Sequence, residues 1–383
     1  MYKRIKLGLI FTASDDWIGG TYYILNLINA LKTLPRHKQP FITILSKNEA
    51  DLNIARNTGY AFLGYRNPYL SKRNLIEKVV DKIYKIVFKR YVIDKRISKK
   101  NIDVLFPANN DWVYKKIRNK LFWFPDFQHV VYPNFFSEEE IKNRNLLVKE
   151  IANSNQNLIL SSCTVKSDWD ALLLNKKCRV HVIPFAVTHP RIDDLNLNEI
   201  LDEFKIGGSY FMISNQFWIH KNHMIVLKAA LKMKQENASL QFIFTGKEDD
   251  YRHPGYFTII KDFIGTNNLE THVKMLGLID RSKQLKLMQQ AIAIIQPSLF
   301  EGWSTVIEDA KLLGKLVIAS NIDVHKEQLG DSGIYFDPFS ENDLVNKIND
   351  NLYFEQTKSV HYKKNVEDFG CCFLNILEKA IAK

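Results

Sequence analysis

The sequence predicts an α/β protein built from two parallel halves. The first observation is length, because 383 residues exceed what one hydrophobic core usually supports. The second is that short apolar runs alternate with helical patterns along the chain, which is typical of parallel strands joined by helices. The third is that this alternation restarts at Tyr210 after a polar stretch. We therefore expect domains over residues 1–188 and 189–360, followed by a C-terminal helix over residues 361–383.

The first half opens with a strand and a glycine pair. Residues 5–11 form an apolar run, and a loop with Gly19 and Gly20 precedes a helical pattern over residues 22–34. Glycine lets backbone N–H groups come close to a ligand, so this loop is a candidate phosphate site. Further strands are predicted at residues 41–45, 104–107, 121–124, 158–162 and 180–184.

An aromatic segment follows the strand predicted at residues 121–124, and it carries Asp126 and His129. Aromatic rings present flat apolar faces to sugar rings, and carboxylate and imidazole groups hydrogen-bond to hydroxyls. The segment therefore suits a pocket for a carbohydrate. The alternative interpretation is that the two polar side chains are satisfied within a polar turn.

The second half repeats the pattern of strand, loop and helix. Residues 210–214 form a strand, and the loop after it carries Gln216 and Lys221 before a helix that runs through Lys234. Further strands are predicted at residues 241–245 and 273–279, and helices at residues 281–290 and from residue 341 onward. The polar residues 189–208 are predicted to link the two halves.

The most informative stretch is Ile294–Ser320, which reads as strand, loop, helix and strand. Its loop carries Glu301, Gly302 and Trp303, and Ser304 or Thr305 can cap the helix that follows. Ligands bind at this edge of a parallel sheet, and the free N–H groups of a helix start bind anions. A carboxylate beside an anion-binding helix start suits a ligand with phosphates and hydroxyls. A sugar nucleotide has both.

The stretch resembles the donor-site signature of the retaining glycosyltransferases of the GT-B fold, in particular family 4, glycosyl transferases group 1. In that family a Glu-Gly-aromatic loop is followed by a second acidic residue on the next helix. Glu301 matches the first carboxylate. Asp309 stands where the family usually has Glu, and Glu308 comes immediately before it.

The loop after residue 214 is similar to a second donor motif of the same family. In that motif an Arg or Lys is followed five positions later by Lys. Lys221 fills the second place, and Gln216 fills the first. This departure removes a positive charge that the family usually directs at the donor diphosphate.

The resemblance implies two Rossmann-like domains that face each other across a cleft, with the C-terminal helix crossing back onto the first domain. It also implies that the glycine pair of the first loop and a His after a strand face the cleft, and that the backbone near Leu278 meets the nucleotide base. The predicted catalytic residues are Glu301, Lys221, His129 and Asp126. The predicted donor-binding residues are Gly19, Gly20, Gln216, Leu278, Gly302, Trp303, Ser304, Thr305, Glu308 and Asp309.

The activity implied by the resemblance is retaining transfer of a hexose-type sugar from a nucleotide-sugar donor to a glycan or lipid-linked glycan acceptor, in cell-surface polysaccharide assembly. No cofactor and no metal are expected, because Lys221 and the helix start at Ser304 can carry the leaving negative charge. Asp168 and Asp170 match the metal-binding D-x-D of another glycosyltransferase fold, but they lie in a helical pattern rather than after a strand. The alternatives are a catalytically impaired relative that binds nucleotide sugars, or a membrane-surface adaptor.

Positive charge is concentrated in one segment. The formal net charge is +11, and Arg66–Lys120 holds 16 Lys and Arg against 5 Asp and Glu. Apolar residues from Leu75 to Val87 recur at helical spacing there, which indicates a basic amphipathic helix. Two interpretations stay open, the solvated face of a helix that covers a sheet and a docking surface for an anionic membrane. No nucleic acid is expected, because no nucleic-acid-binding signature accompanies the charge.

Cysteine usage and hydropathy indicate the compartment. The four cysteines lack metal-ligand spacing, and the adjacent Cys371 and Cys372 are a poor start for a disulfide framework. The apolar run at residues 7–13 is short and is followed by aspartates, which predicts a first strand rather than a signal peptide. We expect a cytoplasmic protein, with the basic segment as a peripheral contact on the inner face of the membrane.

Overall fold

The computed structural model describes residues 4–14, 18–68, 79, 101–108, 112–172, 176–235, 240–352 and 362–382. Most of the basic segment Arg66–Lys120, including its predicted amphipathic helix, lies outside these residues. Membrane contact through this segment therefore stays a prediction. Among the helices that are described, none is both long enough and apolar enough to cross a bilayer.

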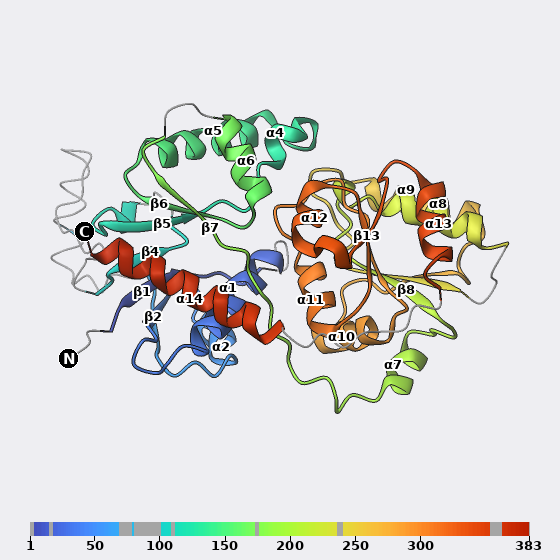
Figure 1. Cartoon of the computed structure of the whole chain (residues 1–383), viewed down its shortest axis with the longest axis horizontal. Helices are drawn as coiled ribbons and strands as arrows, with labels where there is room; N and C mark the ends of the chain where they lie inside the picture. Colours follow the sequence, from blue (N-terminus) through green and yellow to red (C-terminus); the bar gives the residue numbers. More distant parts are fainter. Residues whose placement is uncertain are drawn as a thin grey trace.

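Two parallel sheets form the framework of the described chain, one in each half (Figure 1). The first has the order β3-β2-β1-β4-β5-β6-β7 and the second β10-β9-β8-β11-β12-β13, and all their strand pairs are parallel. The strands of the first sheet are β1 (Lys6–Ile10), β2 (Phe41–Leu45), β3 (Leu63–Arg66), β4 (Val104–Phe106), β5 (Asn119–Trp123), β6 (Asn157–Leu160) and β7 (Arg179–Val182). Those of the second are β8 (Tyr210–Ser214), β9 (Gln241–Thr245), β10 (Val273–Met275), β11 (Ile294–Gln296), β12 (Val317–Ser320) and β13 (Ile334–Phe336).

Helices pack on the sheets because the strands are apolar on both faces. Every residue of β6, β8 and β12 is buried, as expected for parallel strands covered on both sides. The described α-helices of the first half are α1 (Ile18–Lys32), α2 (Ala50–Arg56), α4 (Gln128–Val131), α5 (Glu138–Asn153) and α6 (Cys163–Leu172). Those that follow are α7 (Leu197–Glu203), α8 (His223–Met233), α9 (Tyr256–Thr266), α10 (Arg281–Gln290), α11 (Thr305–Leu313), α12 (Asp323–Leu329), α13 (Glu341–Asn349) and α14 (Tyr362–Ile381).

In each sheet the predicted site loops lie where the order of strand addition reverses, that is, where the chain returns from one edge to continue on the other side of the first strand. In the first sheet the chain moves outward from β1 to β3 and then returns to β4 on the other side of β1. In the second sheet the same reversal separates β8 from β11. Crevices at such switch points are where open α/β sheets bind ligands. The loops after β8 and β11 carry Lys221 and Glu301.

The structure differs from the predicted elements in a few places. Helix α1 begins at Ile18, so Gly19 and Gly20 lie in its first turn rather than in a loop. Strand β10 ends at Met275 because the chain turns at Gly277, whose φ of +64° is in the left-handed region. Helix α7 occupies part of the predicted linker, where the side chain of Asn196 caps its start.

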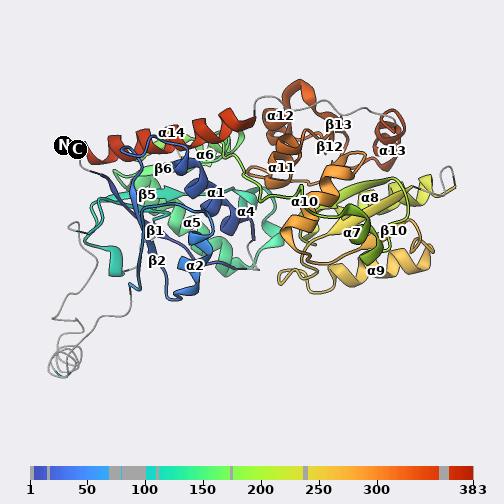
Figure 2. The ribbon, with the colours of Figure 1, turned by 90° about the horizontal axis from the view of Figure 1, so that it is seen from below.

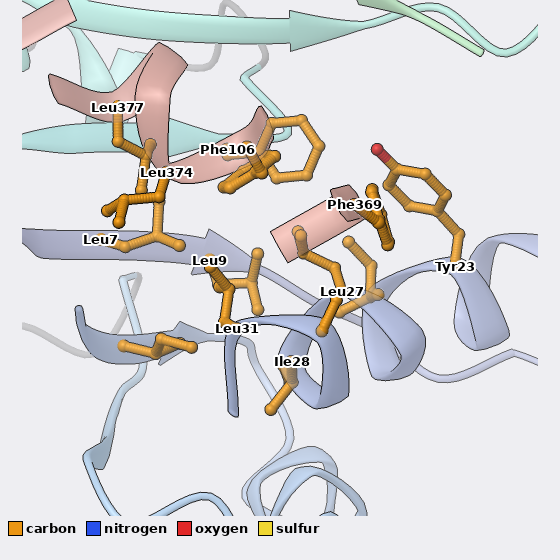
Figure 3. Close-up of a cluster of buried hydrophobic side chains, with 14 of the residues drawn as sticks. Leu7, Leu9, Tyr23, Leu27, Ile28, Leu31, Phe106, Phe369, Leu374 and Leu377 are labelled. Atoms are coloured by element: carbon orange, nitrogen blue, oxygen red, sulfur yellow. The ribbon is translucent and has the colours of Figure 1, made fainter. Parts of the chain in front are cut away.

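Helix α14 returns to the N-terminal half, as the resemblance implied, and lies along α1 (Figures 1 and 2). Figure 3 shows Phe369, Leu374 and Leu377 of α14 in the same core as side chains of β1, β4 and α1. The helix therefore completes the N-terminal core rather than extending the C-terminal one. The buried positions of α14 recur at helical spacing, which gives the helix one apolar face.

Gly370 sets how closely α14 approaches α1. A Cβ atom at this position would lie 2.3 Å from the carbonyl oxygen of Ala30 on α1. We expect Gly370→Ala to lower the free energy of unfolding by about 1–3 kcal/mol, because the helices must separate to admit the methyl group. Denaturant unfolding measures this loss, and Cys371→Ala, at the exposed neighbouring position, is the control. Equal stability of the two variants would contradict the close packing.

Candidate active site

A cavity of about 240 Å³ lies between the two halves. Side chains from α1 and from the segment after β5 line it on the N-terminal side, and the loops after β8, β10 and β11 line it on the other. Most of the residues predicted for the site meet here. They are Gly19, Asp126, Gln216, Lys221, Leu278, Glu301, Gly302, Trp303, Ser304, Thr305 and Asp309.

Glu301 and Lys221 form an ion pair at this cavity, with 2.5 Å between Lys221 Nζ and Glu301 Oε1. The pair is largely buried, since the Lys221 side chain is 15% exposed and that of Glu301 is 10% exposed. Gln296 Nε2 and Ser298 Oγ also donate to Oε1, at 2.9 and 2.8 Å. Within the described part of the chain, every hydrogen bond to the Glu301 side chain ends on Oε1. The carboxylate is thus held in place while Oε2 stays available for a ligand.

Two buried histidines beside this ion pair stay neutral. Burial, and then the nearby charge of Lys221, hold the pKa of His220 well below its ordinary value. Burial lowers the pKa of His325 to about 4, against the opposing charge of Glu301. Near neutral pH both histidines are therefore uncharged, and of these three groups only Lys221 brings a positive charge to Glu301. Neither histidine was singled out from the sequence.

The start of α11 is a capped helix N-terminus at the cavity. Ser304 is the N-cap, and its Oγ accepts a hydrogen bond from the N–H of Ile307 at 3.3 Å. Gln328 of α12 holds the turn, because its Oε1 accepts from the N–H of Ser304 and its Nε2 donates to the carbonyl of the same residue. Free N–H groups and the positive end of the helix dipole face the cavity lined by Ser304 and Thr305.

The two acidic residues of α11 point in different directions. Asp309 lines the cavity, whereas Glu308 faces α12 and α14, where Tyr362 Oη donates to its Oε2 at 2.5 Å. Lys311 and Gln328 donate to Glu308 Oε1, both within 2.9 Å. Consecutive helical residues point about 100° apart, so the two carboxylates cannot share one ligand. Glu308 therefore links α11 to α14, whereas the side chain of Asp309 lines the cavity.

Asp309 is a buried carboxylate that stays ionised. Its Oδ1 accepts a hydrogen bond from Arg281 Nη2 at 2.5 Å and another from His189 Nε2 at 2.9 Å. Burial alone would raise its pKa, but Arg281 and His189 together hold the pKa of Asp309 below its ordinary value. Arg281 also lies over the ring of Tyr22 on α1, 4.8 Å from its centroid. This cluster therefore joins both halves of the molecule.

His129 does not lie at the cavity, in contrast to its expected place in the cleft. It is buried between α4 and α5, where its Nε2 lies 3.3 Å from Asn145 Oδ1, and the rings of Phe124 and Phe136 flank it. The reason is the turn at Phe127, which starts α4 and directs Gln128 rather than His129 to the cavity. His129 is thus buried within the first domain, and among the described residues its Nδ1 has no hydrogen-bond partner.

Of the two remaining predicted residues, Asp126 lies at the cavity and Gly20 does not. Asp126 lines the cavity, and its Oδ1 accepts a hydrogen bond from the N–H of Gln128 at 3.0 Å. Gly20 is buried in the first turn of α1 and does not contribute to the cavity lining, whereas Gly19 does. The glycine pair therefore offers one residue to the cleft rather than two.

The D-x-D motif lies on α6, as expected. Asp170 pairs with Lys166 and Lys176 at the surface, and Trp169 between the two acids is fully buried. Across the residues that the structure describes, no group of three or more His, Cys, Asp or Glu side chains is placed to hold a metal ion.

Several residues that line the cavity or hydrogen-bond to its carboxylates were not identified from the sequence. Arg281 is the first residue of α10 and Gln296 the last of β11, positions that a search for polar residues at the carboxyl edge of strands would find. His189 carries no comparable signal, because it belongs to a polar linker and meets Asp309 across 120 residues of chain.

Comparison with known proteins agrees with this geometry. The family model of glycosyl transferases group 1 matches residues 203–368. A glycosyltransferase from Rickettsia africae superposes with a TM-score of 0.63 at 17% identity, over 99% of this chain and 95% of that one. HepE from Anabaena, in complex with UDP and glucose, gives 0.64 at 15% identity, over 98% and 95%. A search of curated proteins finds no match.

Trehalose-6-phosphate synthase OtsA superposes over 98% of this chain and 99% of its own, with a TM-score of 0.63 at 11% identity. Identities this low carry information about the fold, whereas the family match rests on sequence and covers the second half. The superpositions cover both halves of the chain, and the family match covers the second. The chain therefore has the GT-B fold, and its residues 203–368 match glycosyl transferases group 1.

Proposed function

We propose that this protein is a retaining glycosyltransferase of family 4, which moves a hexose-type sugar from a nucleotide-sugar donor to a glycan or lipid-linked glycan acceptor in cell-surface polysaccharide assembly. The observation that carries the proposal is the convergence of Glu301, Lys221, Asp309 and the start of α11 on one cavity between two Rossmann-like domains. These groups suit the hydroxyls and phosphates of a sugar nucleotide. HepE from Anabaena, a similar fold, was solved with UDP and glucose.

The second domain would bind the donor. Lys221 and the N–H groups at the start of α11 would stabilise the diphosphate as it leaves. Glu301 Oε2 would accept hydrogen bonds from the sugar hydroxyls, and Asp309 would bind the ribose. The backbone at Leu278, whose side chain is exposed beside the cavity, would meet the base. Arg281 brings a further cation to a cavity in which Gln216 replaces the usual charge.

The first domain would bind the acceptor. Asp126 lies at the cavity with Trp123, Tyr22 and Phe185, which combine a carboxylate with aromatic faces for sugar rings. In a retaining reaction of this family the departing phosphate oxygen takes the proton of the acceptor hydroxyl, so no protein nucleophile is required. Closure of the domains would exclude water and so limit hydrolysis of the donor.

A panel of nucleotide sugars tests the proposal by thermal shift. A true donor should raise the melting temperature, because a ligand at 100 times its dissociation constant stabilises the folded state by about 2.7 kcal/mol. The stabilising donor should then release its nucleoside diphosphate when acceptor glycans are added. Stabilisation without release would favour the alternative of a binding-only relative, which the loss of a cation at Gln216 suggests. If no nucleotide sugar raises the melting temperature, the proposal is wrong.

We also propose that transfer needs no metal ion, because Lys221 and the α11 start supply the positive charge for the diphosphate. Turnover should therefore stay within about twofold of its untreated value after incubation with EDTA. The measurement is release of nucleoside diphosphate in chelator, with and without added manganese. Loss of turnover in chelator that manganese restores would contradict this part of the mechanism.

A further inference from the structure

The segment that follows β7 hydrogen-bonds at every second residue to the loop before α11, to α14 or to α11. The carbonyl of Phe185 accepts a hydrogen bond from Trp303 Nε1 at 3.0 Å. The N–H of Val187 donates to Tyr362 Oη, which in turn donates to Glu308. His189 Nε2 donates to Asp309 Oδ1. This alternation is the period of an extended chain, so one side of the segment faces the loop before α11, that helix and the start of α14.

The residue between these contacts is bound to the first domain. The N–H and Oγ1 of Thr188 both donate to Asn26 Oδ1, at 2.8 and 3.1 Å, and Asn29 Nδ2 donates to Thr188 Oγ1 at 2.6 Å. Asn26 and Asn29 belong to α1, and Asn26 is buried. The backbone beside His189 is therefore held by α1, and the imidazole reaches Asp309 from a fixed direction.

The two oxygens of Asp309 are in unequal environments. Oδ1 accepts from both His189 and Arg281, whereas Oδ2 is buried and has no hydrogen-bond partner among the described residues. A buried polar atom without a partner is rare in folded proteins. Because Asp309 lines the cavity, a hydroxyl of a bound ligand can satisfy Oδ2.

Arg281 cannot orient this carboxylate by itself. It donates to Oδ1 through Nη2, and a single donor to one oxygen leaves the carboxylate able to turn about its last torsion, which has a broad energy profile. A second donor from another direction restricts that rotation. His189 supplies this donor, and only 9% of its side chain is exposed.

We propose that His189 is a positioning residue for the donor: its hydrogen bond to Oδ1 turns Asp309 so that Oδ2 meets a ribose hydroxyl of the nucleotide. The inference rests on the proposed function, since it requires a nucleotide at this cavity. It makes the segment between the domains part of the donor site. It also separates His189 from the reacting atoms, because His189 acts through Asp309.

Ribose discrimination tests the inference. Calorimetric titrations would give the dissociation constants of UDP, GDP and ADP, each beside its 2′-deoxy and 3′-deoxy forms. The parent protein should bind the preferred ribonucleotide about tenfold more tightly than one of its deoxy forms, as expected for one hydrogen bond to a charged group. His189→Ala should weaken the ribonucleotide by about the same factor and bring the ratio close to one. A purely structural role for His189 would not change this ratio.

Five further variants sharpen the result. Glutamine places an N–H donor near the position of Nε2, so His189→Gln should keep the discrimination. Asparagine does not reach Asp309, so His189→Asn should lose it, and this variant carries the test if the alanine variant fails to fold. His189→Ala combined with Asp309→Asn should bind no more weakly than Asp309→Asn alone. His181→Ala is the control, because it removes a histidine hydrogen bond to Asn157 of 3.0 Å outside the cavity lining.

Two results would overturn the inference while leaving the proposed function intact. One is a His189→Ala variant that folds and discriminates as the parent does. The other is additive losses in the double variant. A parent protein that binds the ribose and deoxy forms equally would show that Asp309 does not bind ribose, which also overturns the inference. If the parent binds none of the nucleoside diphosphates, the proposed function and the inference both fail.

Discussion

Replacing Glu301 with glutamine should lower the turnover number by at least about 100-fold, the scale of losing one charged group that stabilises a transition state. Glu301 Oε1 accepts hydrogen bonds from Lys221, Gln296 and Ser298, which leaves Oε2 available for a ligand. Glutamine keeps the shape of the side chain but removes the negative charge that, in the proposed mechanism, would face the sugar and the developing positive centre. Release of nucleoside diphosphate under saturating donor measures the effect.

The same substitution should also lower stability, by about 1–3 kcal/mol, because it leaves the charge of Lys221 in a largely buried place without its anion. This differs from an exposed loop carboxylate, which would contribute little. Adding Lys221→Met to Glu301→Gln should recover most of the melting temperature and none of the activity. The two measurements together separate the structural role of the ion pair from its role in transfer.

Glu341→Gln is the matched control, since Glu341 pairs with Lys232 at 3.1 Å on a surface away from the cavity. It should change neither turnover nor the melting temperature beyond a small amount. If Glu301→Gln retains the turnover of the parent, Glu301 is a structural residue. If the double variant remains as unstable as Glu301→Gln, the stability of this region does not depend on the ion pair.

Gly302→Ala should lower turnover by about 100-fold through a different cause, a displacement of the two domains. A Cβ atom at Gly302 would lie 2.0 Å from the carbonyl oxygen of Pro125 and 3.1 Å from Asp126 Cβ, both across the cleft. No rotamer relieves a clash between backbone atoms, so the domains must separate. The cavity of about 240 Å³ is small for a ligand site, as expected of domains drawn together at this point.

The donor Michaelis constant should change little in Gly302→Ala, because most of the proposed donor-binding groups lie in the second domain, whereas the proposed transfer needs both domains. Small-angle scattering should show a larger radius of gyration than that of the parent. Gly207→Ala is the control, because a Cβ atom there meets no heavy atom within 4 Å. Parental turnover with an unchanged radius of gyration would show that the cleft adjusts to the methyl group.

The local sequence pattern correctly predicted the strand before the Glu301 loop, the helix after it and the next strand. The stretch Ile294–Ser320 forms β11, α11 and β12 as expected, and Ser304 caps the helix, because a strand, a cap and an amphipathic turn are each encoded by neighbouring residues. The reversal of strand order that places Lys221 and Glu301 on one cleft was implied by the resemblance rather than by spacing. The sequence order of the strands does not state their order in the sheet.

The contacts between distant residues were decided by tertiary structure. His129 and Gln128 are neighbours on α4, and the packing of α4 against α5 decides that the histidine is buried and the glutamine reaches the cavity. Glu308 and Asp309 are likewise adjacent. The most distant partner of Glu308 is Tyr362, 54 residues away, and that of Asp309 is His189, 120 residues away.

The sequence by itself therefore determined the α/β class, the alternating elements and the loop chemistry of Glu301 and Ser304, because these depend on periodicity and on caps within a few residues. The tertiary structure decided which face of each helix meets the cleft, and which distant donors hold each carboxylate. The physical reason is that a helix fixes the angle between successive side chains but not its own rotation about its axis. Burial of apolar faces, such as that of α14 on α1, fixes that rotation.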